Sequence, residues 1–193
     1  MEINAERVIE LVKSVRPLFM DHERASRITV KGAADFVTQV DFLVQERMRS
    51  GLFDMYPQVQ FMGEEKDNRD IDFSGAVWIL DPVDGTTNLI HDFRCSALSL
   101  ALCDRGQMEL GIIYQPYEDE LFLAQRGKGA FLNGNPIHVS SVKDLGQSLI
   151  SIGTSPYNHD LADRNFEDIK RVFLKCSDIR RTGSAAVDLA YVA

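Results

Sequence analysis

Cysteine is scarce in this sequence, with three residues in 193. Cys95, Cys103 and Cys176 are widely spaced, odd in number and without a C-x-x-C pair. Neither a disulfide framework nor a zinc site is therefore indicated, because both need paired cysteines at short or repeated spacings. We expect all three side chains to be buried, reduced thiols.

Long apolar runs and an excess of basic residues are also lacking. No stretch approaches the roughly 20 apolar residues that a membrane-spanning helix needs, and the acidic start Met1-Glu2-Ile3-Asn4 does not resemble a signal peptide. With 21 Lys and Arg against 29 Asp and Glu, the net charge is −8, whereas proteins that hold nucleic acid present a basic face. We expect no membrane and no nucleic-acid partner, and a cytoplasmic location.

The first half of the chain predicts two helices and then a sheet. Asn4 can cap a helix that runs to about Met20, kinked or ended by Pro17, and Thr38 with Asp41 matches a capping box that opens a helix to about Phe53. From residue 96 onward, alternating segments separated by turns, including the hairpin dipeptide Asn133-Gly134, are typical of a β-meander. The pattern predicts an α+β protein with a large antiparallel sheet flanked by the two helices.

A change of pattern near residue 144 predicts a domain boundary. Beyond Lys143-Asp144-Leu145-Gly146 the expected order is strand, helix, strand, helix, which is typical of an α/β domain. We expect an N-terminal α+β domain at residues 1–143 that carries the metal site, and the start of a C-terminal α/β domain at 144–193. The sequence stops at Ala193 in an apolar helical run with no capping residue, so we expect this second domain to be incomplete.

The most informative segment begins at Trp78-Ile79-Leu80, which predicts a buried strand. Asp81 follows where Pro82 should end that strand, since proline cannot donate to a sheet ladder. Asp84-Gly85-Thr86-Thr87 then predicts a tight turn that opens a helix, whose first N–H groups have no partner within the helix. Two carboxylates can hold a hard cation there, and the N–H groups can hold an anion such as a phosphate. The alternative is that both aspartates merely serve the turn.

A second acidic cluster favours the metal site. Val59-Gln60-Phe61-Met62 predicts another short strand, and it ends in Gly63-Glu64-Glu65. Two strand ends that both carry acids are better explained by a divalent cation than by two turns. The sequence therefore predicts a metal site built from both.

These motifs resemble the inositol monophosphatase family of magnesium-dependent, lithium-sensitive phosphatases. The resemblance rests on the Gly63–Glu65 and Trp78–His91 motifs and extends over the chain through three further segments: Lys31–Thr38, Gly127–Phe131 and Gly183–Ala186. It implies a layered αβαβα sandwich of the sugar-phosphatase type and a homodimer. The family's W-D-x-A-A-G element, which supplies a further metal-binding aspartate, is absent from this sequence.

The resemblance also implies roles for individual residues. Mg²⁺ would be held by Glu64, Asp81, Asp84 and the main-chain carbonyl of Val83. The attacking water would be oriented by Glu64 and Thr86, with Asp41 behind the threonine. The substrate would contact Asp84, Gly85, Thr86, Gly183, Ser184 and Ala185, with Lys31 and Glu65 as further candidates near the site. From the residues alone, Asp41 could serve only as a helix cap, and Gly183-Ser184-Ala185 only as a close helix contact.

The expected activity is hydrolysis of inositol monophosphate, or of a related small polyol or sugar phosphate, by a water activated by Mg²⁺. One alternative is the aspartyl-phosphatase class, with Asp81 as nucleophile. The spacing D-x-x-D-G-T is one residue longer than the D-x-D-G-T of that class, and the upstream glutamates would have no role. The other alternative is a catalytically impaired or regulatory binding form of the same fold.

Overall fold

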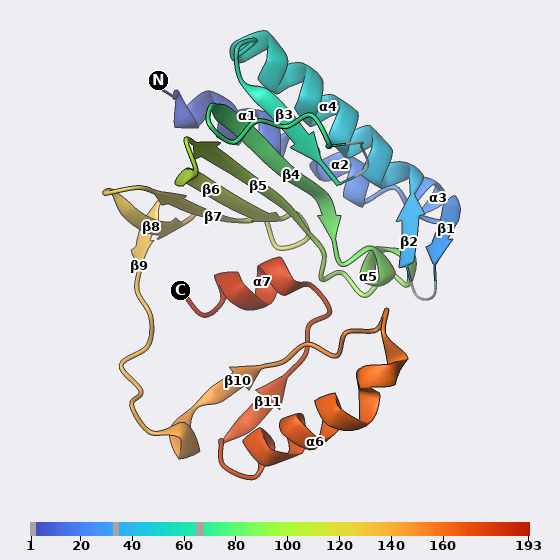
Figure 1. The fold of residues 1–193 in the computed structure, drawn as a ribbon, viewed down its shortest axis with the longest axis vertical. Helices are drawn as coiled ribbons and strands as arrows, with labels where there is room; N and C mark the ends of the chain where they lie inside the picture. Colours follow the sequence, from blue (N-terminus) through green and yellow to red (C-terminus); the bar gives the residue numbers. More distant parts are fainter. Residues whose placement is uncertain (1–2, 33–34, 65–67) are drawn as a thin grey trace.

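The computed structural model describes residues 3–32, 35–64 and 68–193, and its main element is a seven-stranded sheet (Figure 1). The spatial order of its strands is also their order in the chain. The strands are β3 (Gln60–Gly63), β4 (Ala76–Asp84), β5 (Ala97–Asp104), β6 (Gln107–Gln115), β7 (Glu120–Gln125), β8 (Gly129–Leu132) and β9 (Asn135–Ile137). The meander expected from residue 96 onward is confirmed, and so is the α+β class.

One pair of strands departs from the antiparallel expectation. β3 and β4 run parallel, with Gly63 opposite Leu80, while every later pair is antiparallel. The chain returns to the start of the sheet between these two strands, so their carboxyl ends lie at the same edge. As a result Glu64, the first residue after β3, lies next to the end of β4, and its backbone N–H donates to the Leu80 carbonyl at 3.2 Å.

Helices cover one face of this sheet and build the core with it. They are α1 (Ala5–Lys13), α2 (Arg16–Phe19), α3 (His22–Ala25) and α4 (Gln39–Met55). Val12 of α1 and Met48 of α4 are fully buried in a cluster that includes Trp78 and Leu100 of the sheet. The Thr38 capping box of α4 is confirmed.

The expected single helix from Asn4 to about Met20 is wrong in its extent. Asn4 caps α1 as predicted, but α1 ends at Lys13. The proline ring of Pro17 would clash with the carbonyl four residues earlier, which is that of Lys13. Pro17 instead lies in the first turn of α2, where its missing N–H has no helical partner to lose.

The other face of the sheet is approached by α7 (Ala185–Ala190), which contacts β5 and β6 and separates the sheet from a smaller layer (Figure 1). This layer contains α6 (Ala162–Phe173) and the parallel pair β10 (Leu149–Ser151) and β11 (Asp178–Arg180). The strand–helix–strand–helix order expected after residue 144 is confirmed. A domain boundary at 143 stays a prediction.

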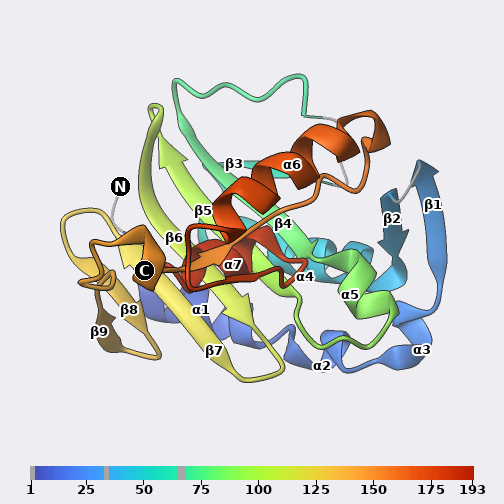
Figure 2. The same cartoon turned by 90° about the horizontal axis from the view of Figure 1, so that it is seen from below.

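The remaining elements are short. They are the hairpin β1 (Ile28–Gly32) and β2 (Asp35–Thr38), the helix α5 (Thr86–Ile90), and the 3-10 turns η1 (Leu145–Gln147) and η2 (His159–Leu161). The hairpin lies beside α5 in two perpendicular views (Figures 1 and 2). Helix α5, the last part of β4 and the start of α7 lie close together. Figure 2 shows this place from the side of α6.

Two simpler expectations can be compared directly. The three cysteines are free, but only Cys103 is buried; Cys95 and Cys176 are partly exposed, so the expectation of full burial was wrong for both. Among the described residues, no helix has the length and apolar composition of a membrane span.

The core supplies a first test of the fold. Leu98 in β5 is fully buried, and truncation to alanine leaves a cavity in the core. We expect Leu98→Ala to lower the free energy of unfolding by about 2–5 kcal/mol, whereas Met108→Ala in the neighbouring β6, at 59% exposure, should change it by less than about 0.5 kcal/mol. Urea unfolding followed by circular dichroism measures both, and equal effects would contradict the assignment of the core.

Candidate active site

The end of β4 forms the centre of the site, and it does not stop where expected. The strand continues through Pro82 to Asp84, but its register with β5 shifts between Asp81 and Asp84, as in a bulge. Pro82 lies within the irregular stretch because it has no N–H for the ladder. The Val83 N–H donates to Oδ1 of Asp81 at 3.1 Å. Asp81 and Asp84 therefore both lie in the irregular last part of β4.

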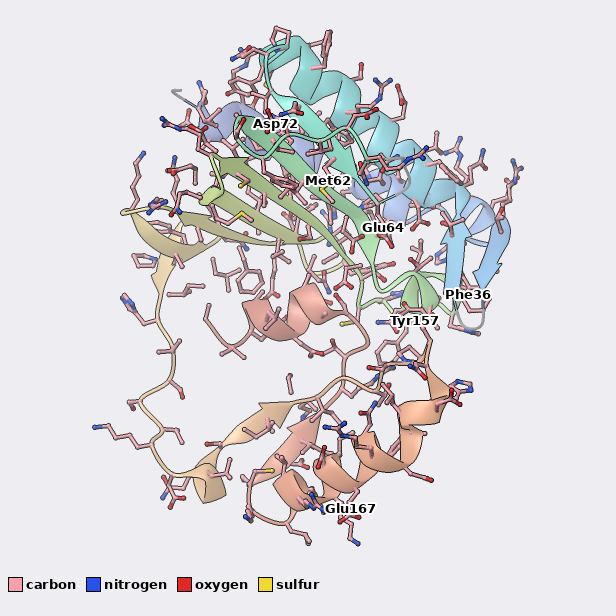
Figure 3. All side chains as sticks on the ribbon, viewed as in Figure 1. Phe36, Met62, Glu64, Asp72, Tyr157 and Glu167 are labelled. Atoms are coloured by element: carbon pink, nitrogen blue, oxygen red, sulfur yellow. The ribbon has the colours of Figure 1, made fainter. Side chains whose placement is uncertain are left out.

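Asp81 lies in an environment that disfavours its negative charge. Burial is the largest cause, followed by the charges of Glu64 and Asp84 and a hydrogen bond with Glu64, and together they raise the pKa of Asp81 to about 8. Figure 3 shows Glu64 at the end of β3, beside the end of β4. Like charges held together in a partly buried place are costly unless a proton or a cation compensates them. The arrangement suits a cation.

The three carboxylates are neighbours without forming a finished metal cage. Within residues 3–32, 35–64 and 68–193, no three His, Cys, Asp or Glu side chains converge as metal ligands. Part of the reason is that Asp84 makes other contacts, described below. The donors present are carboxylate and carbonyl oxygens, which is the set that Mg²⁺ prefers. The chemistry of these donors therefore fits a hard cation.

Asp41 uses its two oxygens for two purposes. Oδ2 accepts hydrogen bonds from the Thr38 backbone N–H at 2.8 Å and from the Thr38 hydroxyl at 2.6 Å, which is the capping box. Oδ1 lies 3.2 Å from the Thr86 hydroxyl, which donates to it. Asp41 lies in the first turn of α4 with 2% exposure, and it connects the start of its own helix to α5. The cap and the contact with Thr86, which the sequence presented as rival roles, coexist.

The Thr86 hydroxyl has a second acceptor. The Val83 carbonyl lies 3.0 Å from it, and a hydroxyl carries only one proton. When that proton points to Asp41, the carbonyl of Val83 and the lone pairs of Thr86 are available to other partners. When it points to Val83, that carbonyl is occupied. Asp41 therefore influences both groups.

Gly85 makes the tight turn possible. Its φ is +91°, and a Cβ at this position would lie 3.2–3.3 Å from the Cys95 and Gly183 carbonyl oxygens and from the Ser184 side chain. Only glycine adopts this conformation without strain and leaves that space. The Ser96 hydroxyl donates to the Gly85 carbonyl at 2.9 Å and fixes the turn.

The expected substrate segment from the C-terminal part lies against this turn. Ser184 donates its hydroxyl to Oδ2 of Asp84 at 2.5 Å, and the Ala186 backbone N–H donates to the same oxygen at 2.6 Å. Ser184 is fully buried. The structure therefore brings Gly183, Ser184 and Ala185 close to Asp84, and their contact with a substrate, which the family resemblance implies, stays a prediction.

Sequence reasoning missed two members of this arrangement. One is the Ala186 N–H, which no side-chain pattern could reveal. The other is Asn88, whose amide donates to the Cys95 carbonyl at 2.6 Å and to the Thr182 carbonyl at 2.9 Å. The presence of Asn88 within the Trp78–His91 motif was the available signal, and its burial in the structure explains why its amide needs partners.

Two cavities meet at Asp84. One, of about 480 Å³, lies between the sheet and α7 and is lined by Asp81, Asp84 and Ala185 among others. The second, of about 1080 Å³, lies on the side of β10 and is lined by Asp84, Arg181 and Gly183 among others. A small solute can therefore approach the carboxylates. Of the two further candidates, Glu65 lies outside the described residues, and for Lys31 only the backbone, in β1, is described.

This geometry agrees with what the whole chain resembles. The model of the inositol monophosphatase family matches residues 1–193. The chain belongs to this family. An inositol monophosphatase from Dictyostelium discoideum is 35% identical over 97% of this chain and 71% of its own length. A protein named Nus factor SuhB from Vibrio cholerae is 40% identical over 89% of this chain and 65% of its own.

The solved structures of the family confirm the fold. The crystal structure of extragenic suppressor protein suhB from Bartonella henselae matches with a TM-score of 0.87 and 32% identity, over 97% of this chain and 73% of that one. The chain spans 61% of the length of some curated relatives, such as Nus factor SuhB from Escherichia coli, and 71% of the Dictyostelium protein. The site roles given above therefore stay predictions for the whole protein.

Proposed function

We propose that the protein is a magnesium-dependent phosphomonoesterase that hydrolyses inositol monophosphate or a related small polyol or sugar phosphate. The observation that carries this proposal is the burial of Asp81 beside Glu64 on one side and Asp84 on the other, where burial and like charge raise the pKa of Asp81 to about 8. Such a cluster is unfavourable without a cation. Membership of the family supports the same reaction.

Glu64, Asp81, Asp84 and the Val83 carbonyl are the groups that would hold Mg²⁺. A bound Mg²⁺ would polarise the phosphoryl oxygens and lower the pKa of a water molecule. The chain contributes the placement of these oxygens, since β3 and β4 end at the same edge and Asp81 and Asp84 lie in the last part of β4.

Thr86 and Asp41 would orient the attacking water. With its proton donated to Oδ1 of Asp41, the Thr86 hydroxyl presents a lone pair that can accept a hydrogen bond from water. Glu64, at the facing strand end, is the second acceptor. Together the two acceptors direct the water's oxygen lone pair toward the phosphorus, which is how positioning lowers a barrier.

The substrate would lie where the two cavities meet. The turn at Gly85 and Thr86 offers backbone N–H groups to the phosphate, while Asp84, Gly183 and Ala185 face the polyol. The Ser184 hydroxyl is already engaged with Asp84, so we assign its contribution to placing that carboxylate. Lys31 and Glu65 stay candidates at the rim. A homodimer in the cytoplasm without nucleic-acid partners remains our expectation.

The decisive test measures the release of phosphate from inositol 1-phosphate by the unaltered chain, with and without Mg²⁺. We expect turnover that requires Mg²⁺ and is inhibited by Li⁺, as the family resemblance implies. Sugar phosphates and 2′-nucleotides in the same assay define the substrate class. Binding of Mg²⁺ without release of phosphate from any of these esters would contradict the proposed activity.

A second candidate is a regulatory binding role, and it is favoured by the 40% identity to a protein named Nus factor SuhB. Such a role would depend on the surface and not on the carboxylate cluster. Complementation separates the two, since a strain that lacks its SuhB can be supplied with this protein or with its Asp81→Asn variant. Rescue by both would support the binding role, and rescue by the unaltered protein alone would support the catalytic one.

A further inference from the structure

Asp84 joins two parts of the chain that are far apart in sequence. It ends β4 in the N-terminal part, and its two hydrogen-bond donors, Ser184 and the Ala186 N–H, are 100 and 102 residues later at the start of α7. Among the described residues both bonds fall on Oδ2, at 2.5 and 2.6 Å. Hydrogen bonds to a carboxylate of this length are of the charge-assisted, stronger kind. Within the described part of the chain Oδ1 has no hydrogen-bond donor, and Asp84 lines the same cavity as Asp81.

The single proton of the Ser184 hydroxyl is committed to Asp84. At the same oxygen Ser184 accepts from the Val187 N–H at 3.3 Å as the N-cap of α7. It is fully buried, so its side chain does not reach solvent. The residue that begins α7 is therefore also the residue that orients Asp84.

Asn88 forms a second connection between the same parts. Its amide binds the Thr182 carbonyl, and its Oδ1 would lie 2.9 Å from a Cβ placed on Gly183, whose φ is +88°. Glycine at 183 thus allows the chain to pass closely over α5 in a conformation that other residues avoid. One connection lies on each side of Gly183, at Thr182 and at Ser184. Together they hold the segment that leads into α7 in one docked position.

We propose that Ser184 and Asn88 are positioning residues that couple cation binding at Asp84 to the docking of α7. This inference rests on the proposed function, because it takes Asp84 as a cation ligand. Docked α7 holds Oδ2 and so presents Oδ1 to the cation in one orientation. By reciprocity, a cation that favours this orientation stabilises the docked position of α7 by the same free energy. The order of the C-terminal part then depends on the metal site.

The test uses Ser184→Ala, with Ser151→Ala as its matched control. Ser151 also donates to α7, to Oδ1 of Asp188 at 3.0 Å, and the hydrogen bonds found in the described part of the chain include none between Ser151 and Asp84. In calorimetric titration with Mg²⁺, we expect the Ser184→Ala variant to bind Mg²⁺ about 5–150-fold more weakly than the unaltered chain does, which is the usual range for coupled sites. Ser151→Ala should bind Mg²⁺ like the unaltered chain. Thermal unfolding of each variant without Mg²⁺ verifies that it is folded.

A second measurement needs no substitution. Hydrogen exchange of the α7 amides, residues 185–190, should slow when Mg²⁺ is added to the unaltered chain, while exchange in α6 should not change. Absence of Mg²⁺ binding by the unaltered chain would overturn the proposed function itself. The other outcome is that the unaltered chain binds Mg²⁺, that Ser184→Ala binds it equally well, and that the exchange of the α7 amides does not slow. This outcome would overturn the coupling alone and leave the phosphatase proposal standing.

Discussion

Asp81→Asn is expected to abolish magnesium-dependent phosphatase activity and at the same time to stabilise the metal-free chain. The variant loses a proposed ligand of Mg²⁺. Loss of a group that only hydrogen-bonds to a metal ligand lowers metal affinity by roughly 10–100-fold, so loss of the ligand itself should lower it by more. Asparagine keeps an oxygen that can accept from the Val83 N–H, so the turn should survive. The charge that its neighbours disfavour is gone. Calorimetry, phosphate release and thermal unfolding measure the three effects.

The stabilisation should depend on pH, and its sign follows from the pKa. Folding raises the pKa of Asp81 from 3.8 to about 8. Between these values the folded chain holds a proton that the unfolded chain has released, so metal-free stability falls as pH rises. The asparagine of the variant cannot titrate. The Tm of Asp81→Asn should therefore match that of the parent near pH 4 and exceed it at pH 8 by at least about 2–4 °C, which corresponds to roughly 1 kcal/mol.

A suitable control is Asp54→Asn, which removes an exposed aspartate on α4 far from the site. This variant should follow the parent at every pH and bind Mg²⁺ normally. A large fall in the metal-free Tm of Asp81→Asn, with activity retained, would show that Asp81 is structural and would contradict the metal assignment.

Asp41→Asn should lower kcat strongly while it leaves the helix cap in place. The side-chain oxygen of asparagine can replace Oδ2 and accept from Thr38. Its NH₂ group then faces Thr86 in place of Oδ1 and donates to the threonine hydroxyl, which must turn its proton to the Val83 carbonyl. The threonine proton then lies on the Val83 carbonyl, which is a proposed oxygen ligand of the cation, and the negative charge behind Thr86 is lost. We expect a loss of about 10²–10⁴-fold in kcat, the scale of a lost acid–base contribution, at saturating Mg²⁺.

The comparison variant is Asp41→Ala, which removes both roles of the side chain. It should lose the cap as well and lower stability by about 0.5–2 kcal/mol, whereas Asp41→Asn should unfold within roughly 0.5 kcal/mol of the parent. Kinetics over a range of Mg²⁺ concentrations with a urea unfolding series would distinguish the two. Turnover of Asp41→Asn equal to that of the parent would leave the cap as the whole role of Asp41.

Much of the fold was predictable because its patterns are local. The alternation of residues 97–125, the Asn133-Gly134 hairpin and the Thr38 capping box each depend on neighbours within a few positions, and all three are present. The end of α1 at Lys13 was also predictable, because the ring of Pro17 would clash with the Lys13 carbonyl if the helix continued. What was misjudged locally was β4, because a bulge can carry proline through a strand that a regular ladder would end.

The assembly of the site depended on contacts that no local pattern specifies. The sequence alone determined that Glu64 follows one strand, that Asp81 and Asp84 lie at the end of another, and that glycine stands at 85 and 183. Only the tertiary structure decided that β3 and β4 are parallel, that Asp41 serves Thr38 and Thr86 with different oxygens, and that Asp84 receives two hydrogen bonds from α7. Backbone conformation responds to adjacent residues, whereas partners 100 positions apart meet only once the sheet order and the packing of α7 have placed them.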